Sequence, residues 1–419
     1  MTFKTKFFFY IYLFCYIFSF YIFMFPTSML ITIPLFICVC VSKEWMKCFM
    51  EIWGRKYIVY SFMYLVAICS VCFLITFFYR QNDFSLLILL YTQIVHFICA
   101  TFFFTFLTVK KISFDELCDG YINIFVVQTF IELIASSVKP IGNFIRFFNH
   151  YDPSIVVGLG SRVRGYALSA ATTYHLSLIY GVAFIIYIKT ILEVNKITYK
   201  KIIQGCLIVV GVFFAGRTGF VGMGLGGLYY LITFQTTLRK KLTAIRKLII
   251  VIFCTISIVL AWAPENLRML LVDNLIPYAF EFLYNRNDSG KMQTASTNEL
   301  KEMWNKDFDD YEIVLGSGKY VDERGYYMKV DPGFLRHLLY GGIAFYFLLW
   351  CYHLFLNFPL KYYKRKDYFI FFIIFIYFCV MDFKGVTIAV NKFAFVTSLL
   401  FGYSYLFLPH HKGDAIYAE

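Results

Sequence analysis

The chain has 419 residues, of which 60% are hydrophobic and 21% aromatic, and its mean hydropathy is +0.67. In soluble domains only about half of the residues are apolar, so the composition indicates a polytopic membrane protein and excludes a string of soluble domains. The formal net charge of +13 comes from lysines and arginines in short clusters between apolar runs. That pattern favours orientation in a membrane over nucleic-acid binding.

The cysteines do not indicate a metal or disulfide framework. Most of the 12 cysteines lie inside apolar runs, and the longest polar segment, residues 264–334, has none. They are therefore interpreted as small hydrophobic residues. Walker-type phosphate loops, HExxH and paired CxxC motifs are absent from the sequence, which argues against an ATP-driven pump and a zinc protease.

About twelve apolar runs predict helical spans, since crossing the hydrocarbon takes about twenty residues. In chain order they are expected at residues 7–24, 28–42, 57–79, 85–108, 117–138, 166–188, 202–215, 219–237, 248–263, 335–356, 369–385 and 392–408. The first run lacks an A-x-A-like cleavage site, so a retained span is expected rather than a signal peptide. The expected fold class is an all-α polytopic membrane protein.

Alternate connectors are basic and are expected to face the cytoplasm, together with both termini. They lie around residues 43–56, 110–111, 189–201, 239–247 and 361–366. The polar segment 264–334 then faces outward as one large extracytoplasmic loop, with short helices expected near 277–284 and 297–304. The expected division is nine spans at 1–263, the loop at 264–334, and three spans with a cytoplasmic tail at 335–419.

Arginines stand where this topology expects water or a polar cavity near the outer face: Arg162, Arg164, Arg217 and Arg336. An ionisable group at membrane depth costs about 2.5–3.5 kcal/mol or more, so it usually has a task. Gly216 and Gly219 flank Arg217, which predicts a helix break open to a ligand. Guanidinium groups hold phosphate oxygens by two-point contacts, so the set indicates an anion site. The alternatives are snorkelling for Arg217 and interfacial anchoring for Arg162 and Arg164.

Residues 311–342 hold the other candidates. Gly316 and Gly318 predict a turn or a substrate-contacting loop, and a dinucleotide site is rejected because no strand and helix start frame them. Asp331, directly before a span, is a candidate proton acceptor, with helix capping as the alternative. His337, like His175 in an earlier span, is either a packing residue or a proton shuttle.

These residues resemble, in order and in topology, three motifs of the O-antigen polymerase and ligase superfamily, which includes the Wzy-type polymerases. The first is Arg162-Val163-Arg164-Gly165 before a span, and the second is Gly216-Arg217-Thr218-Gly219, similar to a Ser-Arg-Thr of the family. The third is Gly316-x-Gly318 followed by Asp331-x-Gly333 and Gly341-Gly342. By motif, the resemblance covers residues 155–345.

Two departures from the family pattern bear on the type of enzyme. Asp331-Pro332 stands where ligases usually have a histidine and an asparagine, which favours a polymerase over a ligase. Ala170-Ala171-Thr172 stands where the first motif often continues with proline and asparagine. The first departure also puts a histidine-based mechanism in doubt.

The resemblance implies a GT-C-type glycosyltransferase in the bacterial inner membrane, with its active site facing the periplasm. It would transfer a growing glycan from undecaprenyl pyrophosphate to a lipid-linked repeat unit, without metal, nucleotide or other cofactor. The expected partners are undecaprenyl-pyrophosphate-linked oligosaccharides, membrane lipids and a chain-length regulator protein, but no nucleic acid.

The same resemblance, with the chemistry of the residues, suggests a role for each candidate. Arg217 first, then Arg162, Arg164 and Arg336, would stabilise the charge on the leaving pyrophosphate. Asp331 would take the proton of the acceptor hydroxyl. Substrate contacts would come from the loop and the span after it, and aromatic rings among them would stack on sugars. The residues are Gly316, Gly318, Tyr320, Tyr326, Tyr327, Gly333, His337 and Trp304.

Other functions stay open. A ligase and a capsule polymerase belong to the same class, and a lipid-linked oligosaccharide flippase belongs to another. Transporters usually show internal repeats and short loops, whereas this sequence has no defensible repeat and one dominant loop. The sequence therefore favours the enzyme.

We expect Arg217→Ala and Arg162→Ala to abolish long surface polysaccharide, because each removes a charge that would neutralise the leaving pyrophosphate. The measurement is the polysaccharide ladder on a gel, at membrane protein levels matched to the wild type. Full-length ladders from both variants would contradict the predicted pyrophosphate clamp.

Overall fold

The computed structural model describes residues 3–149, 167–171, 173–193, 198–233, 295–323, 325–358 and 368–409, together with residues 246, 257, 261, 265–269, 272–273, 277 and 281. In these residues the regular structure is helical apart from two short hairpins. Among the residues that the structure describes, five helices are long and apolar enough to cross a membrane, or six if one bent pair is a single span, against about twelve spans expected from the sequence. The protein is therefore an α-helical, multi-pass membrane protein.

The helices follow the predicted apolar runs closely. The span-length helices are α5 Lys56–Phe78, α6 Ser85–Val109, α7 Phe114–Ser137, α10 Thr173–Leu192 and α19 Gly333–Asn357. Shorter apolar helices are α12 Gly219–Thr233, α20 Tyr368–Asp382 and α21 Lys392–Phe407. The predicted run at 248–263 lies almost wholly outside the described residues.

The remaining described elements are short or amphipathic. In chain order they are α1 Phe3–Phe18, β1 Tyr21–Ile22, β2 Phe25–Pro26, α2 Thr27–Leu30, α3 Thr32–Val41, α4 Lys43–Trp53, α8 Lys139–Phe147, α11 Tyr199–Ala215, α14 Glu265–Met269, α17 Ala295–Trp304, α18 Asp310–Leu315, β3 Val321–Asp322, β4 Gly325–Tyr326 and the 3-10 helix η2 Tyr327–Lys329. Both hairpins are antiparallel, pairing β1 with β2 and β3 with β4. Helix α17 contains the short helix expected near 297–304.

The chain forms two compact units, each built from segments distant in sequence. Unit 1 combines Met1–Leu30 with Asp115–Met292, and unit 2 combines Ile31–Phe114 with Gln293–Glu419. Unit 2 thus combines helices from the first and the last third of the chain, which differs from the sequential division at residues 263 and 334. The two units are described separately below.

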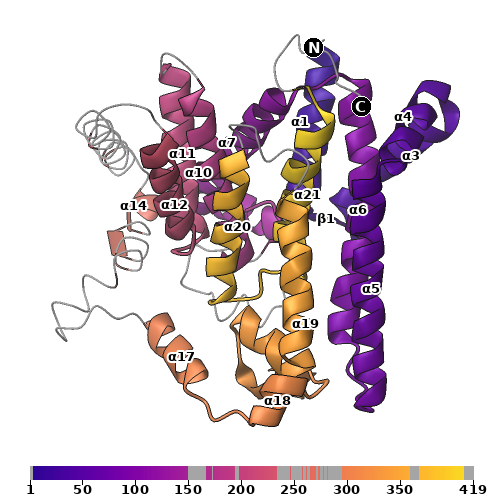
Figure 1. Ribbon diagram of the computed structural model, residues 1–419. Helices are drawn as coiled ribbons and strands as arrows, with labels where there is room; N and C mark the ends of the chain where they lie inside the picture. The colour runs from indigo at the N-terminus through magenta and orange to yellow at the C-terminus, as the bar shows by residue number, and fades with distance from the viewer. Residues whose placement is uncertain are drawn as a thin grey trace. The chain divides into compact units, whose positions relative to one another are not determined.

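In unit 1, glycines let α10, α11 and α12 approach one another closely (Figure 1). A Cβ at Gly222 of α12 would lie 2.4 Å from the Gly181 Cα of α10, so the two backbones touch. A Cβ at Gly211 of α11 would lie 2.2 Å from the Tyr180 ring of α10. Close backbone contact through small residues is a usual way for helices to associate in membranes. It holds the junction of α11 and α12 against α10.

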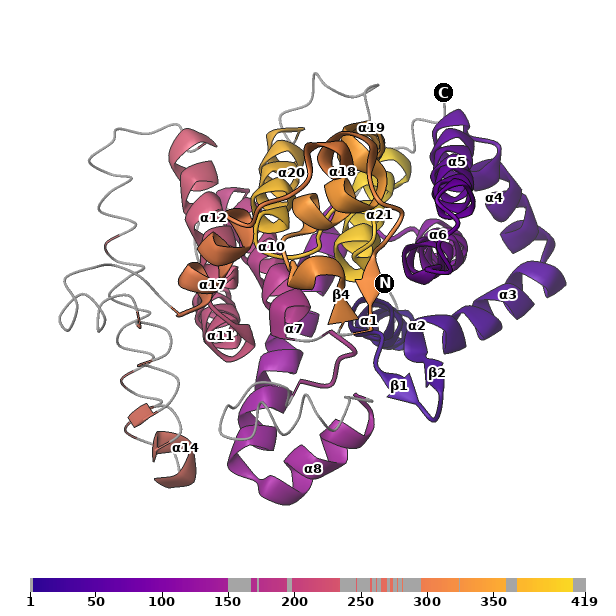
Figure 2. The same cartoon turned by 90° about the horizontal axis from the view of Figure 1, so that it is seen from below.

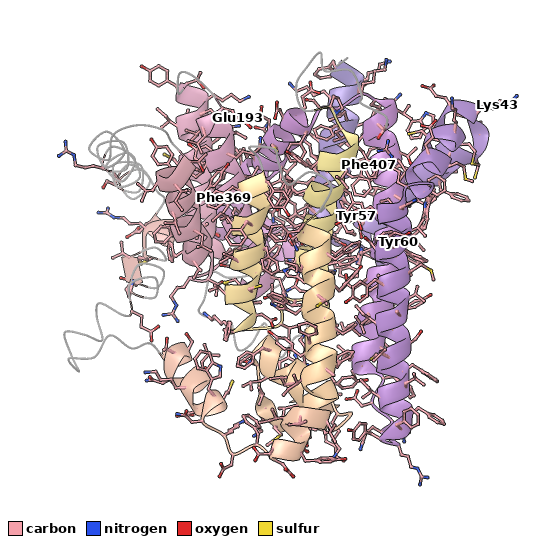
Figure 3. All side chains as sticks on the ribbon, in the orientation of Figure 1. Lys43, Tyr57, Tyr60, Glu193, Phe369 and Phe407 are labelled. Carbon is pink, nitrogen blue, oxygen red and sulfur yellow. The ribbon has the colours of Figure 1, made fainter. Side chains whose placement is uncertain are left out.

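In unit 2, α5 presents one face to the protein and another outward (Figure 3). The Tyr57 ring packs on Phe355 of α19 at 4.8 Å and on Tyr403 of α21 at 5.0 Å between centroids. Tyr60, one turn further along, is 59% exposed. Such apolar exposure fits a helix face toward lipid rather than water.

The segment after the first hairpin differs from the expected single span and basic connector. Helices α3 and α4 meet at an angle of 108° near Ser42, and Figure 2 shows them as two arms at one edge of the unit. In α4, apolar residues recur at helical spacing and pack on α6, with the rings of Phe49 and Phe102 stacked at 4.8 Å. Lys43 and Lys47 stay exposed, so this basic stretch is an amphipathic helix.

Helix α19 is kinked where it passes α18 (Figure 1). The loop after α18 supplies the hydrogen bonds that are missing at the kink. Gly342 has φ 73° and ψ −176°, which interrupts the helix. The carbonyls of Leu339 and Tyr340 accept hydrogen bonds from the backbone N–H groups of Ser317 and Gly318, at 2.7 and 2.9 Å. The predicted glycine loop is thus fixed to the span.

We expect Gly342→Ala to destabilise the protein by about 1–3 kcal/mol, because a side chain is strained at positive φ. Its Cβ would also lie 2.3 Å from the Val314 carbonyl oxygen. The measurement is thermal unfolding in detergent. The matched control is Gly227→Ala in α12, where a Cβ meets nothing within 4 Å. An unchanged melting temperature for Gly342→Ala would contradict the lock between loop and kink.

Candidate functional site

The predicted helix break at Arg217 is present in unit 1. Helix α11 ends at Ala215, Gly216 has φ 148°, and α12 begins at Gly219. The side chain of Ser177 in α10 fixes the break: its hydroxyl donates to the Gly216 carbonyl at 2.7 Å and accepts from the Gly219 N–H at 2.6 Å. Thr218 donates its hydroxyl to the same Ser177 oxygen at 2.7 Å. Arg217 therefore projects from a backbone turn that α10 holds in place.

Arg217 forms an ion pair with Glu281. The guanidinium Nη1 contacts the carboxylate Oε2, and the two side chains are 14% and 23% exposed. An ion pair that is largely shielded from water is weakly screened, so the two charges hold each other firmly. Glu281 was not predicted from the sequence, because nothing in the order of residues shows that it reaches Arg217, 64 positions away.

A second acidic residue in unit 1 was also missed. Glu132 lies inside α7 and is 2% exposed, and its Oε2 accepts a hydrogen bond of 3.4 Å from the Tyr180 hydroxyl of α10. Its Oε1 has no hydrogen-bond partner among the described residues, and neither has the carboxamide of Gln128 one turn earlier. The available signal was that Glu132 is the one charged residue in the sequence between residues 120 and 138.

Two of the predicted arginines belong to the first motif, and one predicted histidine follows it. Arg162 and Arg164 lie outside the described residues. His175 is described at the start of α10, where its ring packs edge-on against Tyr174 with centroids 5.4 Å apart. Of the four candidate arginines, the described residues of unit 1 therefore contain Arg217.

In unit 2, Arg336 lies in the first turn of α19 between two tyrosine rings. Its guanidinium carbon is 4.0 Å from the Tyr320 ring centroid and 3.7 Å from that of Tyr326. Cation–π contacts of this kind contribute about 0.5–2 kcal/mol each. Arg336 is 7% exposed, and its Nε has no hydrogen-bond partner among the described residues. A buried cation is thus held by aromatic faces that leave its hydrogen-bonding capacity unfilled.

Asp83, from the loop between α5 and α6, fixes the backbone at Tyr320, one of the two tyrosines that contact Arg336. Its Oδ2 accepts the backbone N–H groups of Tyr320 and Val321 at 2.5 and 2.7 Å, and its Oδ1 accepts the Ser85 N–H at 3.0 Å. Partial burial alone would raise the pKa of this carboxyl, but the hydrogen bonds to the charged form outweigh it and lower the pKa. Asp83 was not predicted from the sequence, because its hydrogen-bond partners Tyr320 and Val321 lie more than 200 positions further along the chain.

Asp331 precedes the α19 helix without capping it. The N-cap position is Pro332, and no side chain makes a capping hydrogen bond there. The pKa of the Asp331 carboxyl is raised, because partial burial disfavours the charged form more than the positive charges of Arg336 and Lys306 favour it. A raised pKa makes a carboxylate a better proton acceptor. The capping alternative thus has no support from the structure.

Gly333 and His337 occupy packed positions in the first turns of α19. A Cβ at Gly333 would lie 2.2 Å from an Asp382 carboxylate oxygen, so only glycine fits there. His337 is fully buried, and its ring stacks between those of Tyr320 and Tyr346, with centroids 6.1 and 6.4 Å away. His337 is thus enclosed by aromatic rings, and its two ring nitrogens have no hydrogen-bond partner among the described residues.

The aromatic residues of the predicted lid differ in exposure. Tyr320 is 2% exposed, whereas Tyr326 and Trp304 are 47% and 45% exposed. Tyr327 lies between these limits and donates its hydroxyl to a Glu312 carboxylate oxygen at 2.9 Å. Tyr326 and Trp304 therefore have exposed ring surface in this group, although Tyr326 also contacts Arg336, whereas the ring of Tyr320 is buried.

We expect Asp83→Asn to release the backbone at Tyr320 and Val321, because hydrogen bonds to a charged group contribute about 1.5–3 kcal/mol. Amide hydrogen exchange over residues 316–323 should become faster by about tenfold or more. The matched control is Asp322→Asn, an exposed acid in the same loop. In the wild type the protection factor of the same amides, which corrects for the intrinsic pH dependence of exchange, should fall as pH drops below about 3.9, the ordinary pKa of aspartate, since a lowered pKa gives stability that is lost on protonation. Unchanged protection in Asp83→Asn would contradict this role.

Comparison with known proteins gives no family assignment. No protein-family model, no curated protein and no solved structure matches the chain. Among the described residues, no group of three or more His, Cys, Asp and Glu side chains is placed to hold a metal ion. The indications of function are therefore the chemistry of the two arginine sites and the motifs of the chain itself.

Proposed function

We propose that the protein is a membrane glycosyltransferase of the O-antigen polymerase type. The observation that carries the proposal is Arg336, a buried cation whose Nε has no hydrogen-bond partner among the described residues, in the turn of α19 that follows Asp331. Desolvated guanidinium groups favour phosphate oxygens as partners, and a carboxylate beside them can accept a proton. Both groups are needed to move a sugar from a pyrophosphate carrier to a hydroxyl.

The reaction would use a glycan linked to undecaprenyl pyrophosphate as donor and a lipid-linked repeat unit as acceptor. The acceptor oxygen attacks the anomeric carbon while the bond from that carbon to the pyrophosphate oxygen breaks. The electron pair stays on the pyrophosphate, and the acceptor proton passes to a carboxylate, for which the sequence suggests Asp331. The pyrophosphate activates the sugar itself, so the step needs no nucleotide.

The arginines would neutralise the charge that grows on the leaving pyrophosphate. Arg217 in unit 1 and Arg336 in unit 2 are described, each as a separate candidate for this role, and Arg162 and Arg164 are assigned by the motif alone. Positive groups held in place before the reaction stabilise developing charge without reorganisation. Tyr326 and Trp304, which expose ring surface, would contact the sugars.

The proposed setting is the bacterial inner membrane, with the site facing the periplasm and both termini in the cytoplasm. The basic connectors support this orientation by the positive-inside rule. The partners would be undecaprenyl-pyrophosphate-linked oligosaccharides, surrounding lipids and a chain-length regulator protein. A ligase or capsule polymerase would use the same chemistry on another acceptor.

One observation favours a second candidate, a transporter of lipid-linked oligosaccharides. Glu132 and Gln128 are buried within a span with unfilled hydrogen-bonding capacity, and such intramembrane acids often serve ion coupling. A coupled transporter would move the same lipid without joining sugars. The two candidates are separated by whether glycosidic bonds form.

We expect the purified protein to build a glycan ladder from lipid-linked repeat units, without added nucleotide or metal. Arg336→Gln should slow the reaction by about 100-fold or more, because it removes a charge that stabilises the transition state. The matched control is Arg80→Gln, an exposed arginine after α5 in the same unit, which should stay within about twofold of the wild type.

Two results would contradict the proposal. Equal rates in Arg336→Gln and wild type would remove Arg336 from the site. No ladder from the wild type, together with movement of the lipid across vesicle membranes, would favour the transporter.

A further inference from the structure

The ion pair between Arg217 and Glu281 places a carboxylate where the proposed function needs a pyrophosphate. Arg217 is fixed at its backbone, since Ser177 and Thr218 hold the break from which it projects. Glu281 comes from the segment that the sequence assigned to the outer loop. The anion site of Arg217 is thus already filled by a group of this chain.

A structural role alone is a weak account of this pair. Shielded ion pairs are often no more stabilising than apolar residues of the same volume, because removing both charges from water is costly. A carboxylate is also a poorer partner for guanidinium than a pyrophosphate, which carries more charge and more acceptor oxygens. A lipid-linked pyrophosphate reaching Arg217 would therefore displace Glu281.

The displaced carboxylate would stand close to the reacting atoms. The anomeric carbon of the donor sugar is bonded directly to a pyrophosphate oxygen, so a pyrophosphate on Arg217 puts that carbon next to the place Glu281 has left. The acceptor hydroxyl must approach the same carbon. A general base has to lie within hydrogen-bond reach of that hydroxyl, directly or through one water.

We propose that Glu281 holds the anion site of Arg217 in the substrate-free protein and becomes the proton acceptor when the donor pyrophosphate takes its place. This inference rests on the proposed glycosyl transfer and assigns its base. The acceptor oxygen bonds to the anomeric carbon, and the bond to the pyrophosphate oxygen breaks with its electron pair kept on the pyrophosphate at Arg217. The acceptor proton passes to the Glu281 carboxylate, and the resulting acid releases it to water.

The assignment differs from the one the sequence suggested. Asp331 is influenced by Arg336 through space, but its carboxylate makes no hydrogen bond with that guanidinium, whose two faces are covered by Tyr320 and Tyr326. Glu281 touches its arginine directly. Of the two acids, Glu281 is the one whose release is tied to pyrophosphate binding.

The test is steady-state kinetics of the purified full-length protein with lipid-linked repeat units extracted from cells that lack it. Glu281→Gln should lower kcat by about 100- to 10,000-fold, the usual contribution of a general base. Its KM should stay equal or fall, because the neutral amide competes less well for Arg217. Asp331→Asn should lower kcat at least about tenfold less than Glu281→Gln, because one carboxylate takes the proton. The matched control is Glu299→Gln, an exposed acid of α17, which should stay within about twofold of the wild type.

A conservative variant separates chemistry from folding. Glu281→Asp keeps the carboxylate on a shorter side chain, so it should retain at least about tenfold more activity than Glu281→Gln, with KM near that of the wild type. If Glu281→Gln fails to fold, Glu281→Asp alone decides, since a raised KM with unchanged kcat would indicate a purely structural pair and overturn the proposal.

The remaining outcomes distinguish this inference from the proposed function. A ladder from the wild type with an equal rate in Glu281→Gln removes Glu281 as base and leaves the glycosyltransferase intact. A loss in Asp331→Asn as large as that in Glu281→Gln returns the role to Asp331. Absence of any ladder from the wild type overturns the proposed function itself.

Discussion

A helix can break inside a membrane only where other groups satisfy the backbone it exposes, and this constraint organises both arginine sites. In α19 the break at Gly342 frees the carbonyls of Leu339 and Tyr340. Ser317 and Gly318 supply the missing N–H groups. Because the loop is tied to the kink, the tyrosine that follows it reaches Arg336. The position of Arg336 thus depends on hydrogen bonds one turn further along α19.

The break in unit 1 obeys the same constraint with different means. There a single hydroxyl, that of Ser177, both donates to the Gly216 carbonyl and accepts the N–H of Gly219. In each unit the arginine stands beside a glycine-containing interruption whose exposed backbone is satisfied by a separate segment. Such interruptions fix the direction of a charged side chain more firmly than a continuous helix end does.

A structural feature could be predicted from the sequence where neighbouring residues determine it. The break at Arg217 was predictable, because Gly216 and Gly219 mark it within four residues, and the start of α19 was predictable from Pro332 and the apolar run after it. The bend between α3 and α4 was not, since it follows from packing of Phe49 on α6. Asp83, Ser177 and Glu281 were missed for the same reason. Each acts on a partner far along the chain, and residue order carries no signal of that contact.

The two arginines differ in what surrounds their charge, and this difference bears on their use. Arg217 is neutralised by a carboxylate, so an incoming anion there must exchange with Glu281. Arg336 is covered by aromatic faces, which stabilise its charge without cancelling it, so an anion there adds to the site and displaces no acid. A reaction that gathers negative charge on a departing group needs a cation that stays positive throughout, and a proton acceptor that is released only when substrate is bound. In unit 2 the tyrosine rings leave the charge of Arg336 uncancelled, and in unit 1 an anion that binds Arg217 would release the Glu281 carboxylate.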